Sequence, residues 1–214
     1  MGPRRIEAFS DGVLAIVITI MVLEMKVPHG VELTSLRPLI PVFLSYVLSF
    51  VFLAIYWNNH HHLLHVTTGV TGTILWANMH LLFWLSLVPF VTGWMGENHF
   101  APVPTALYGV VLLLAAIAYL MLQHAILVQE GPDSILAAAL GHDWKGRFSP
   151  LIYGIAVAGA FLHPGIAGTL YVLAAVLWLI PDRRIERSLA QAVAQHARTV
   201  HDLSDQPQGG HKLG

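Results

Sequence analysis

The chain has 214 residues, of which 56% are hydrophobic and only 11% charged, and its mean hydropathy is +0.65. Soluble domains carry roughly 25% charged residues, so this composition excludes a soluble fold and indicates an all-α membrane protein. The formal net charge of −1 argues against a nucleic-acid-binding surface, and the absence of cysteine excludes disulfide bonds and thiolate metal sites.

Six apolar segments are long enough, or nearly long enough, to cross a bilayer. A spanning helix needs about 20 mostly apolar residues, and proline, glycine and charged residues divide the chain into pieces of about that size. In chain order we expect spans over residues 6–27, 39–64, 73–95, 105–128, 150–162 and 166–180. The last two are short, so a single re-entrant hairpin is the alternative there.

The basic residues indicate how the chain is oriented. With six spans, nine of the eleven Lys and Arg residues fall on the side of both termini, and only Lys26 and Arg37 fall on the other. Short loops rich in Lys and Arg stay cytoplasmic, so both termini are expected inside. Beyond the membrane domain at 1–181, the pattern predicts a cytoplasmic amphipathic helix over 182–205 and a flexible tail over 206–214.

Polar residues interrupt the first expected span. Ser10 and Asp11 lie near its start, where they either cap the helix or serve a function at membrane depth. A stripe at helical spacing then follows and consists of Ile16, Thr19, Ile20 and Leu23. Such a stripe is usually core or lipid contact, and a hydroxyl like that of Thr19 often bonds the preceding turn of its own helix.

A histidine-rich stretch ends the second expected span. It reads Trp57-Asn58-Asn59-His60-His61-His62, with His65 one turn after His61. The i, i+4 spacing of His61 and His65 is found in metal-binding helices, but the second and third spans contain no acidic residue to support a metal. Hydrogen bonding between helices is therefore favoured over a metal site, with Trp76, Asn78 and His80 of the third span as partners.

No nucleophile elbow, phosphate-binding glycine loop or catalytic carboxylate pair is present, so the sequence does not predict an enzyme. The alternative in that class is a membrane metalloenzyme built on His61, His65 and His80.

Four motifs, taken in order, resemble the transmembrane protein 175 family of potassium channels. The first is Arg5-x-x-x-Phe9-Ser10-Asp11. The others are Tyr56-Trp57-Asn58-Asn59-His60-His61, Leu75-Trp76-Ala77-Asn78 and Leu87-Val88-Pro89-Phe90. The resemblance covers roughly the first hundred residues. One signature with six spans resembles the bacterial members, so the bacterial cytoplasmic membrane is the expected location.

The resemblance implies a homotetramer in the lipid bilayer whose pore is lined by the first helix of each subunit. In this pore Ile16, Ile20 and Leu23 would form the hydrophobic constriction, and Thr19 would form a polar layer. The channel would conduct monovalent cations, K⁺ among them, and would need no cofactor. Arg5, Phe9, Ser10 and Asp11 would hold the pore helix in register. Their implied partners are Trp57, His60, His61, Trp76 and Asn78. A proton-permeable leak channel is the alternative within this class.

Overall fold

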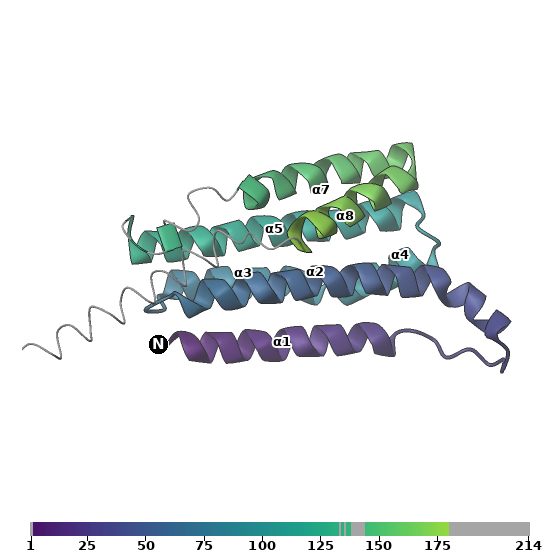
Figure 1. The fold of residues 1–214 in the computed structure, drawn as a ribbon, viewed down its shortest axis with the longest axis horizontal. Coiled ribbons are helices and arrows are strands. Elements are labelled where there is room, and N and C mark those ends of the chain that lie inside the picture. The colour runs from purple at the N-terminus through teal and green to yellow at the C-terminus, as the bar shows by residue number, and fades with distance from the viewer. Residues whose placement is uncertain (1, 133, 135, 138–143, 180–214) are drawn as a thin grey trace, which may run out of the picture.

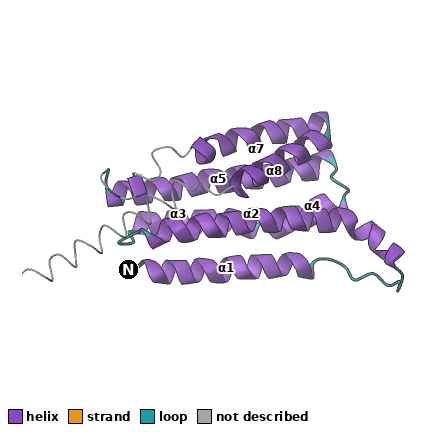
Figure 2. Ribbon diagram, viewed as in Figure 1, coloured by secondary structure: helices purple, strands orange, loops and turns teal. Residues whose placement is uncertain are grey.

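The computed structural model describes residues 2–179 apart from 133, 135 and 138–143. The amphipathic helix predicted over 182–205 and the tail predicted over 206–214 lie outside the described residues. Every regular element in the described part is helical (Figure 2). The helices are α1 (Pro3–Leu23), η1 (Leu33–Leu39), α2 (Ile40–His65), α3 (Gly72–Ser86), α4 (Val88–Glu97), α5 (Pro102–Glu130), α7 (Trp144–Leu162) and α8 (Pro164–Leu179).

The helices lie side by side in an up-and-down bundle (Figure 1). Helix α1 forms one edge and packs against α2, α3 and α4, whereas α7 and α8 form the opposite edge and pack on α5 and on each other. Four stretches are long and apolar enough to cross a membrane, namely Pro3–Leu23, Leu33–His65, Gly72–Glu97 and Pro102–Glu130. Two shorter apolar helices, Phe148–Leu162 and Pro164–Leu179, follow. The all-α membrane fold predicted from composition is therefore confirmed.

Proline accounts for two differences from the predicted spans. The third span was expected to be one helix over 73–95, but α3 ends at Ser86 and α4 begins at Val88, with a turn at Leu87. Pro89 has no N–H to donate to the carbonyl four residues earlier, and its ring crowds that carbonyl, so the helix breaks there. The fifth span was expected to begin at Pro150, but α7 begins at Trp144 and contains Pro150 in its interior.

The first turn of a helix tolerates proline, because the N–H groups there have no intrahelical partner. Pro3 begins α1, Pro102 begins α5 and Pro164 begins α8, and Pro41 follows the first residue of α2. Because α1 already begins at Pro3, the alternative that Ser10 and Asp11 cap this helix was wrong: both residues lie about two turns inside it.

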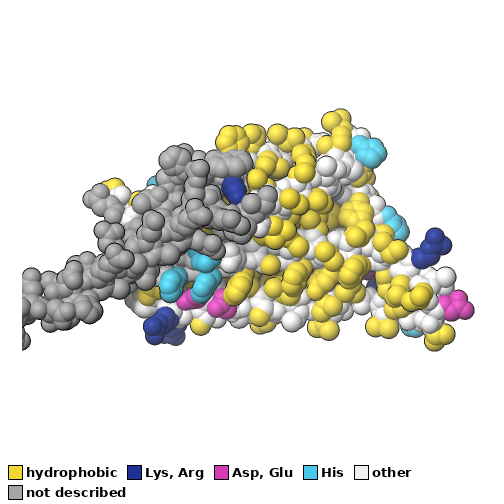
Figure 3. Space-filling model, in the orientation of Figure 1, with side chains coloured by type: hydrophobic (Ala, Val, Ile, Leu, Met, Phe, Trp, Pro, Cys, Tyr) yellow, Lys and Arg dark blue, Asp and Glu magenta, His cyan; other side chains and the backbone are white. Residues whose placement is uncertain are grey.

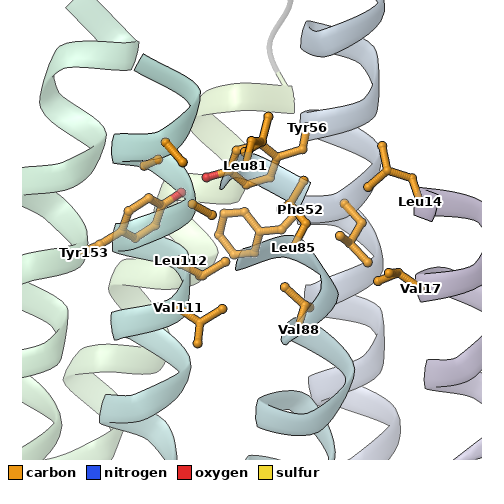
Figure 4. Packing of buried hydrophobic residues seen from close by; sticks show 14 of the residues in the cluster. Leu14, Val17, Phe52, Tyr56, Leu81, Leu85, Val88, Val111, Leu112 and Tyr153 are labelled. Atoms are coloured by element: carbon orange, nitrogen blue, oxygen red, sulfur yellow. The ribbon is translucent and has the colours of Figure 1, made fainter. Parts of the chain in front are cut away.

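The core consists of apolar side chains from α1 to α5, α7 and α8, part of which Figure 4 shows. Leu14 and Val17 of α1 point toward Phe52 of α2. The rings of Phe52 and Tyr153 of α7 pack edge to face, with their centroids 6.0 Å apart. The outer surface carries a broad band of hydrophobic side chains across its middle (Figure 3). Apolar groups thus face both the interior and the lipid, as expected for a bundle solvated by acyl chains.

Candidate pore helix and its support

Helix α1 has two faces of different character. Ile6, Ser10, Leu14, Val17 and Met21 recur every three or four residues and are buried against the bundle. The predicted stripe lies on the opposite side: Ile16 is 60% exposed, Ile20 40% and Leu23 80%. The stripe is therefore not part of the subunit core, and in the single subunit it is an uncovered apolar surface.

Thr19 lies within this exposed stripe. Its hydroxyl donates to the backbone carbonyls of Ile16 at 2.9 Å and Ala15 at 3.1 Å, so its one proton is shared within its own helix. Bonding to the preceding turn was the ordinary explanation for a threonine at this position, and the structure shows that bond. The hydroxyl oxygen keeps lone pairs that can face the exposed side of α1.

Two polar contacts at the flank of the buried face join α1 to α2 near the N-terminus. The indole N–H of Trp57 donates to Asp11 Oδ1 at 2.9 Å. His61 Nδ1 lies 2.7 Å from Glu7 Oε1. Glu7 and Asp11 are four residues apart on α1, and Trp57 and His61 are four apart on α2, so two successive turns of each helix are joined.

A buried network joins α1, α2 and α3 beside these contacts. Ser10, His60 and Asn78 are each at most 2% exposed. His60 Nε2 lies 2.7 Å from Asn78 Oδ1, Asn78 Nδ2 donates to Ser10 Oγ at 3.1 Å, and Ser10 Oγ donates to the Ile6 carbonyl at 2.8 Å. The amide oxygen accepts, so His60 carries its proton on Nε2. His60 Nδ1 is buried and has no hydrogen-bond partner among the residues that the structure describes.

Some predicted site residues lie outside these contacts. Trp76 is 78% exposed on α3, and Phe9 is 52% exposed on α1. His80 accepts a hydrogen bond from Trp84 of its own helix at 2.9 Å instead of joining the network. Arg5 is exposed near the start of α1. The buried hydrogen bonds among these helices centre on Asn78, and neither Trp76 nor His80 takes part in them.

Sequence analysis missed Glu7, although a signal was available. Glu7 and Asp11 share the i, i+4 spacing of Trp57 and His61, so two matched pairs could have been recognised once α1 was placed beside α2. His65 stacks on His61 with ring centroids 6.0 Å apart. Among the described residues, no group of three or more His, Asp or Glu side chains is arranged to hold a metal ion.

Comparison with known proteins decides the family. Residues 5–89 match the family described as endosomal/lysosomal potassium channel TMEM175, a range that includes the signature of α1, the end of α2 and all of α3. A potassium channel of Chryseobacterium sp. is 53% identical over 191 residues, which cover 89% of this chain and all of that protein. The chain belongs to the TMEM175 family of potassium channels.

Other members of the TMEM175 family agree in sequence and in structure. A potassium channel of Chamaesiphon minutus is 34% identical over 185 residues, covering 79% of this chain and 90% of its own. The crystal structure of a lysosomal potassium-selective channel TMEM175 homolog from the same organism superimposes with a TM-score of 0.73 at 31% identity. The match covers 83% of this chain and 96% of that chain. The metalloenzyme alternative was therefore wrong, because the chain belongs to an ion-channel family.

Proposed function

We propose that this TMEM175 chain forms a K⁺-permeable cation channel as a homotetramer, with a hydrophobic constriction made by α1 of four subunits. The proposal rests on the difference between the two faces of α1. One face is fastened to the bundle through Ser10 and Asp11, and the other presents Ile16, Ile20 and Leu23 uncovered. Fourfold symmetry would bring four copies of that open stripe around one axis and bury it.

The chemistry of such a pore follows from its apolar rings. An ion that crosses a ring of isoleucine or leucine sheds part of its hydration shell and finds few replacement ligands, and a narrow apolar ring can also close by dewetting. K⁺ holds its water less tightly than Na⁺, so its dehydration costs less and a modest K⁺ preference results. The four Thr19 oxygens would supply partial compensation between the Ile16 and Ile20 rings.

The topology supports a bacterial cytoplasmic membrane location with both termini inside. Six successive spans, with η1 counted with α2 and α3 with α4, lead the chain back toward the side where it began, and Arg4, Arg5, Lys145 and Arg147 lie on that side. Lys26 and Arg37 lie on the other side, so the distribution follows the positive-inside rule.

Ion flux from purified protein in liposomes tests the proposal. Vesicles loaded with K⁺ are diluted into Na⁺, and a protonophore-coupled dye reports the charge that leaves. We expect flux from the wild type and a changed flux or K⁺/Na⁺ preference in Ile16→Asn. Ile155→Asn is the matched control, because Ile155 is 53% exposed on α7, away from α1. Absence of flux from a verified oligomer, or equal effects of the two substitutions, would contradict a pore along α1.

Proton permeation is the second candidate. The chicken protein described as an endosomal/lysosomal proton channel TMEM175 is 34% identical over 101 residues, which cover 42% of this chain and 20% of that protein. The same liposomes distinguish the two ions. A reversal potential that follows the pH gradient at fixed K⁺ would favour protons, whereas one that follows the K⁺ gradient supports the proposed function.

A further inference from the structure

A cleft of about 360 Å³ lies among the end of α1, the first half of α2 and α4. It is at the end of the bundle opposite the N-terminus, and the buried network around Asn78 is not part of it. Its lining includes the aromatic side chains of Tyr46, Phe90 and Trp94 and the carboxylates of Glu24 and Glu97. This volume is within the range of small-molecule sites, which run from about 300 to 1,000 Å³.

The electrostatics of the cleft favour a cation. Glu24 is the residue that follows α1, and Glu97 is the last residue of α4, so both carboxylates lie at helix C-termini, where the helix dipole is already negative. Glu24 reaches across to α4, because its Oε2 lies 3.2 Å from the point that a Cβ on Gly93 would occupy. Two carboxylates and two helix ends therefore place negative charge around one opening.

Only one of these carboxylates has a cationic partner in the described structure. Lys26 Nζ lies 2.9 Å from Glu97 Oε1, and this hydrogen bond and the attraction of the carboxylate raise the pKa of Lys26, which stays charged at neutral pH. Glu24 forms no ion pair with any residue that the structure describes. The cleft thus keeps an unneutralised carboxylate beside one that is neutralised by a solvent-exposed lysine.

The aromatic side chains indicate which kind of cation fits. Phe90 and Trp94 are one turn apart on α4 and stack with centroids 6.3 Å apart, and Tyr46 lines the cleft from α2. Aromatic faces beside a carboxylate attract cations that carry apolar groups, as quaternary ammonium sites do. A divalent metal fits poorly, since the cleft offers two carboxylates and the described residues contain no three-ligand cluster there.

We propose that this cleft binds a substituted ammonium ion, with Glu24 as its counter-ion and Phe90 and Trp94 as its aromatic contacts. The site uses none of the residues of the proposed constriction, although Glu24 directly follows Leu23, and the proposal does not depend on that constriction. The ammonium group can belong to a free organic cation or to the amine headgroup of a lipid, because the cleft opens where α1 and α4 end. Lys26 competes with the bound cation for the negative charge of the cleft.

Calorimetric titration of the purified full-length channel with tetraethylammonium tests the site directly. We expect saturable binding that Glu24→Gln and Trp94→Leu each weaken about fivefold or more, the range of a partly desolvated cation–π or charge contact. Lys26→Met should strengthen binding about twofold or more, because it frees Glu97. Glu32→Gln is the matched control, since Glu32 bonds Thr34 beside η1 and does not line the cleft.

The direction of the Lys26→Met effect protects the test against misfolding, because a damaged fold would not strengthen binding. Ile16→Asn should bind tetraethylammonium like the wild type, which separates this site from block in the proposed pore. The titration is then repeated in nanodiscs of phosphatidylethanolamine and of phosphatidylglycerol to identify the natural source of the ammonium group. If phosphatidylethanolamine competes with tetraethylammonium, the site binds a lipid headgroup. If binding is equal in the two lipids, the site binds a free cation. Absence of saturable binding, or equal weakening by Glu32→Gln, would overturn the proposal.

Discussion

The indole N–H of Trp57 donates to the carboxylate of Asp11 across 2.9 Å, and this contact fixes the rotation of α1 relative to α2. With Asp11 bonded to α2 and Ser10 buried against α3, the stripe of Ile16, Ile20 and Leu23 lies on the side of α1 that faces away from the bundle. The polar signature and the apolar stripe are thus two consequences of one helix orientation: contacts on one face determine what the opposite face presents.

Removal of the Asp11 carboxylate should weaken the attachment of α1 to the bundle. Asp11→Ala leaves the Trp57 indole without its acceptor, and we expect a loss of about 1–2 kcal/mol in stability, the range for one hydrogen bond between membrane helices. Detergent-extracted protein should melt at a lower temperature and give less oligomer on size-exclusion chromatography. Asp11→Asn is the control, because its amide oxygen can still accept. A normal oligomer with an altered ion preference in Asp11→Ala would assign Asp11 to the pore instead.

Asn78 should be the most sensitive position of the buried network. Asn78→Ala leaves His60 Nε2 without an acceptor and Ser10 without a donor at a buried site, and no described residue bonds His60 Nδ1 even in the wild type. Each buried polar group left unsatisfied costs about 1–3 kcal/mol, so we expect a sharp fall in thermal stability and expression. Trp76→Leu, two residues away on the exposed side of α3, should change stability much less. Equal losses in the two variants would show that the network adds nothing specific.

The six apolar spans could be predicted because hydrophobicity alone carries that signal in a membrane protein. Apolar length and charge placement give α1, α2 and α5 to within a few residues at most ends. Proline was misread in both directions: it was taken as the start of α7, where Pro150 lies inside the helix, and overlooked at Pro89, where the helix breaks. A proline leaves the backbone carbonyl four residues earlier without its hydrogen bond. Whether the helix bends, breaks or begins there depends on which neighbouring groups bond that carbonyl, and these neighbours are distant in sequence.

The network around α1 could be predicted only in part. The motif resemblance indicated that Ser10, His60 and Asn78 lie close together. It did not predict that Trp76 is exposed, because that depends on which side of α3 faces the bundle. Neither α2 nor α3 has a marked polar face to indicate that rotation, because both helices are apolar nearly all round. Glu7 and His61 are 54 positions apart, and the matched i, i+4 spacing of the two pairs indicates their contact only after α1 has been placed beside α2.

Gly109 should be required for the close approach of α5 to α7 and α8. A Cβ at this position would overlap the Tyr171 hydroxyl and lie 2.8 Å from Val157 Cγ2. Tyr171 is buried and donates to the Thr105 carbonyl at 3.0 Å, so it cannot move without losing that bond. Gly109→Ala should therefore destabilise the bundle by about 1–3 kcal/mol, the range for overpacked cores.

Gly154 on α7 provides the matched control, because a Cβ there meets nothing within 4 Å. Gly154→Ala should leave the melting temperature unchanged or raise it, since alanine is the better helix former by about 1 kcal/mol. Thermal melting of the two variants in one detergent measures the contrast. If Gly109→Ala were as stable as Gly154→Ala, the tight packing of Tyr171 on α5 would be disproved.

Leu23 should control ion passage with little effect on folding. Its side chain is 80% exposed at the last turn of α1, so truncation removes almost no contact within the subunit. In the proposed tetramer four Leu23 side chains form one apolar ring, and Leu23→Ala widens and partly wets that ring, which lowers the barrier to a hydrated ion. We expect liposomal K⁺ flux to rise roughly threefold or more while the preference for K⁺ over Na⁺ falls, because a wider ring demands less dehydration. Leu173→Ala on α8, which is 57% exposed, should change neither quantity. An unchanged flux in Leu23→Ala beside a responsive Ile16→Asn would move the constriction toward the middle of α1, whereas unchanged flux in both would remove α1 from the pore.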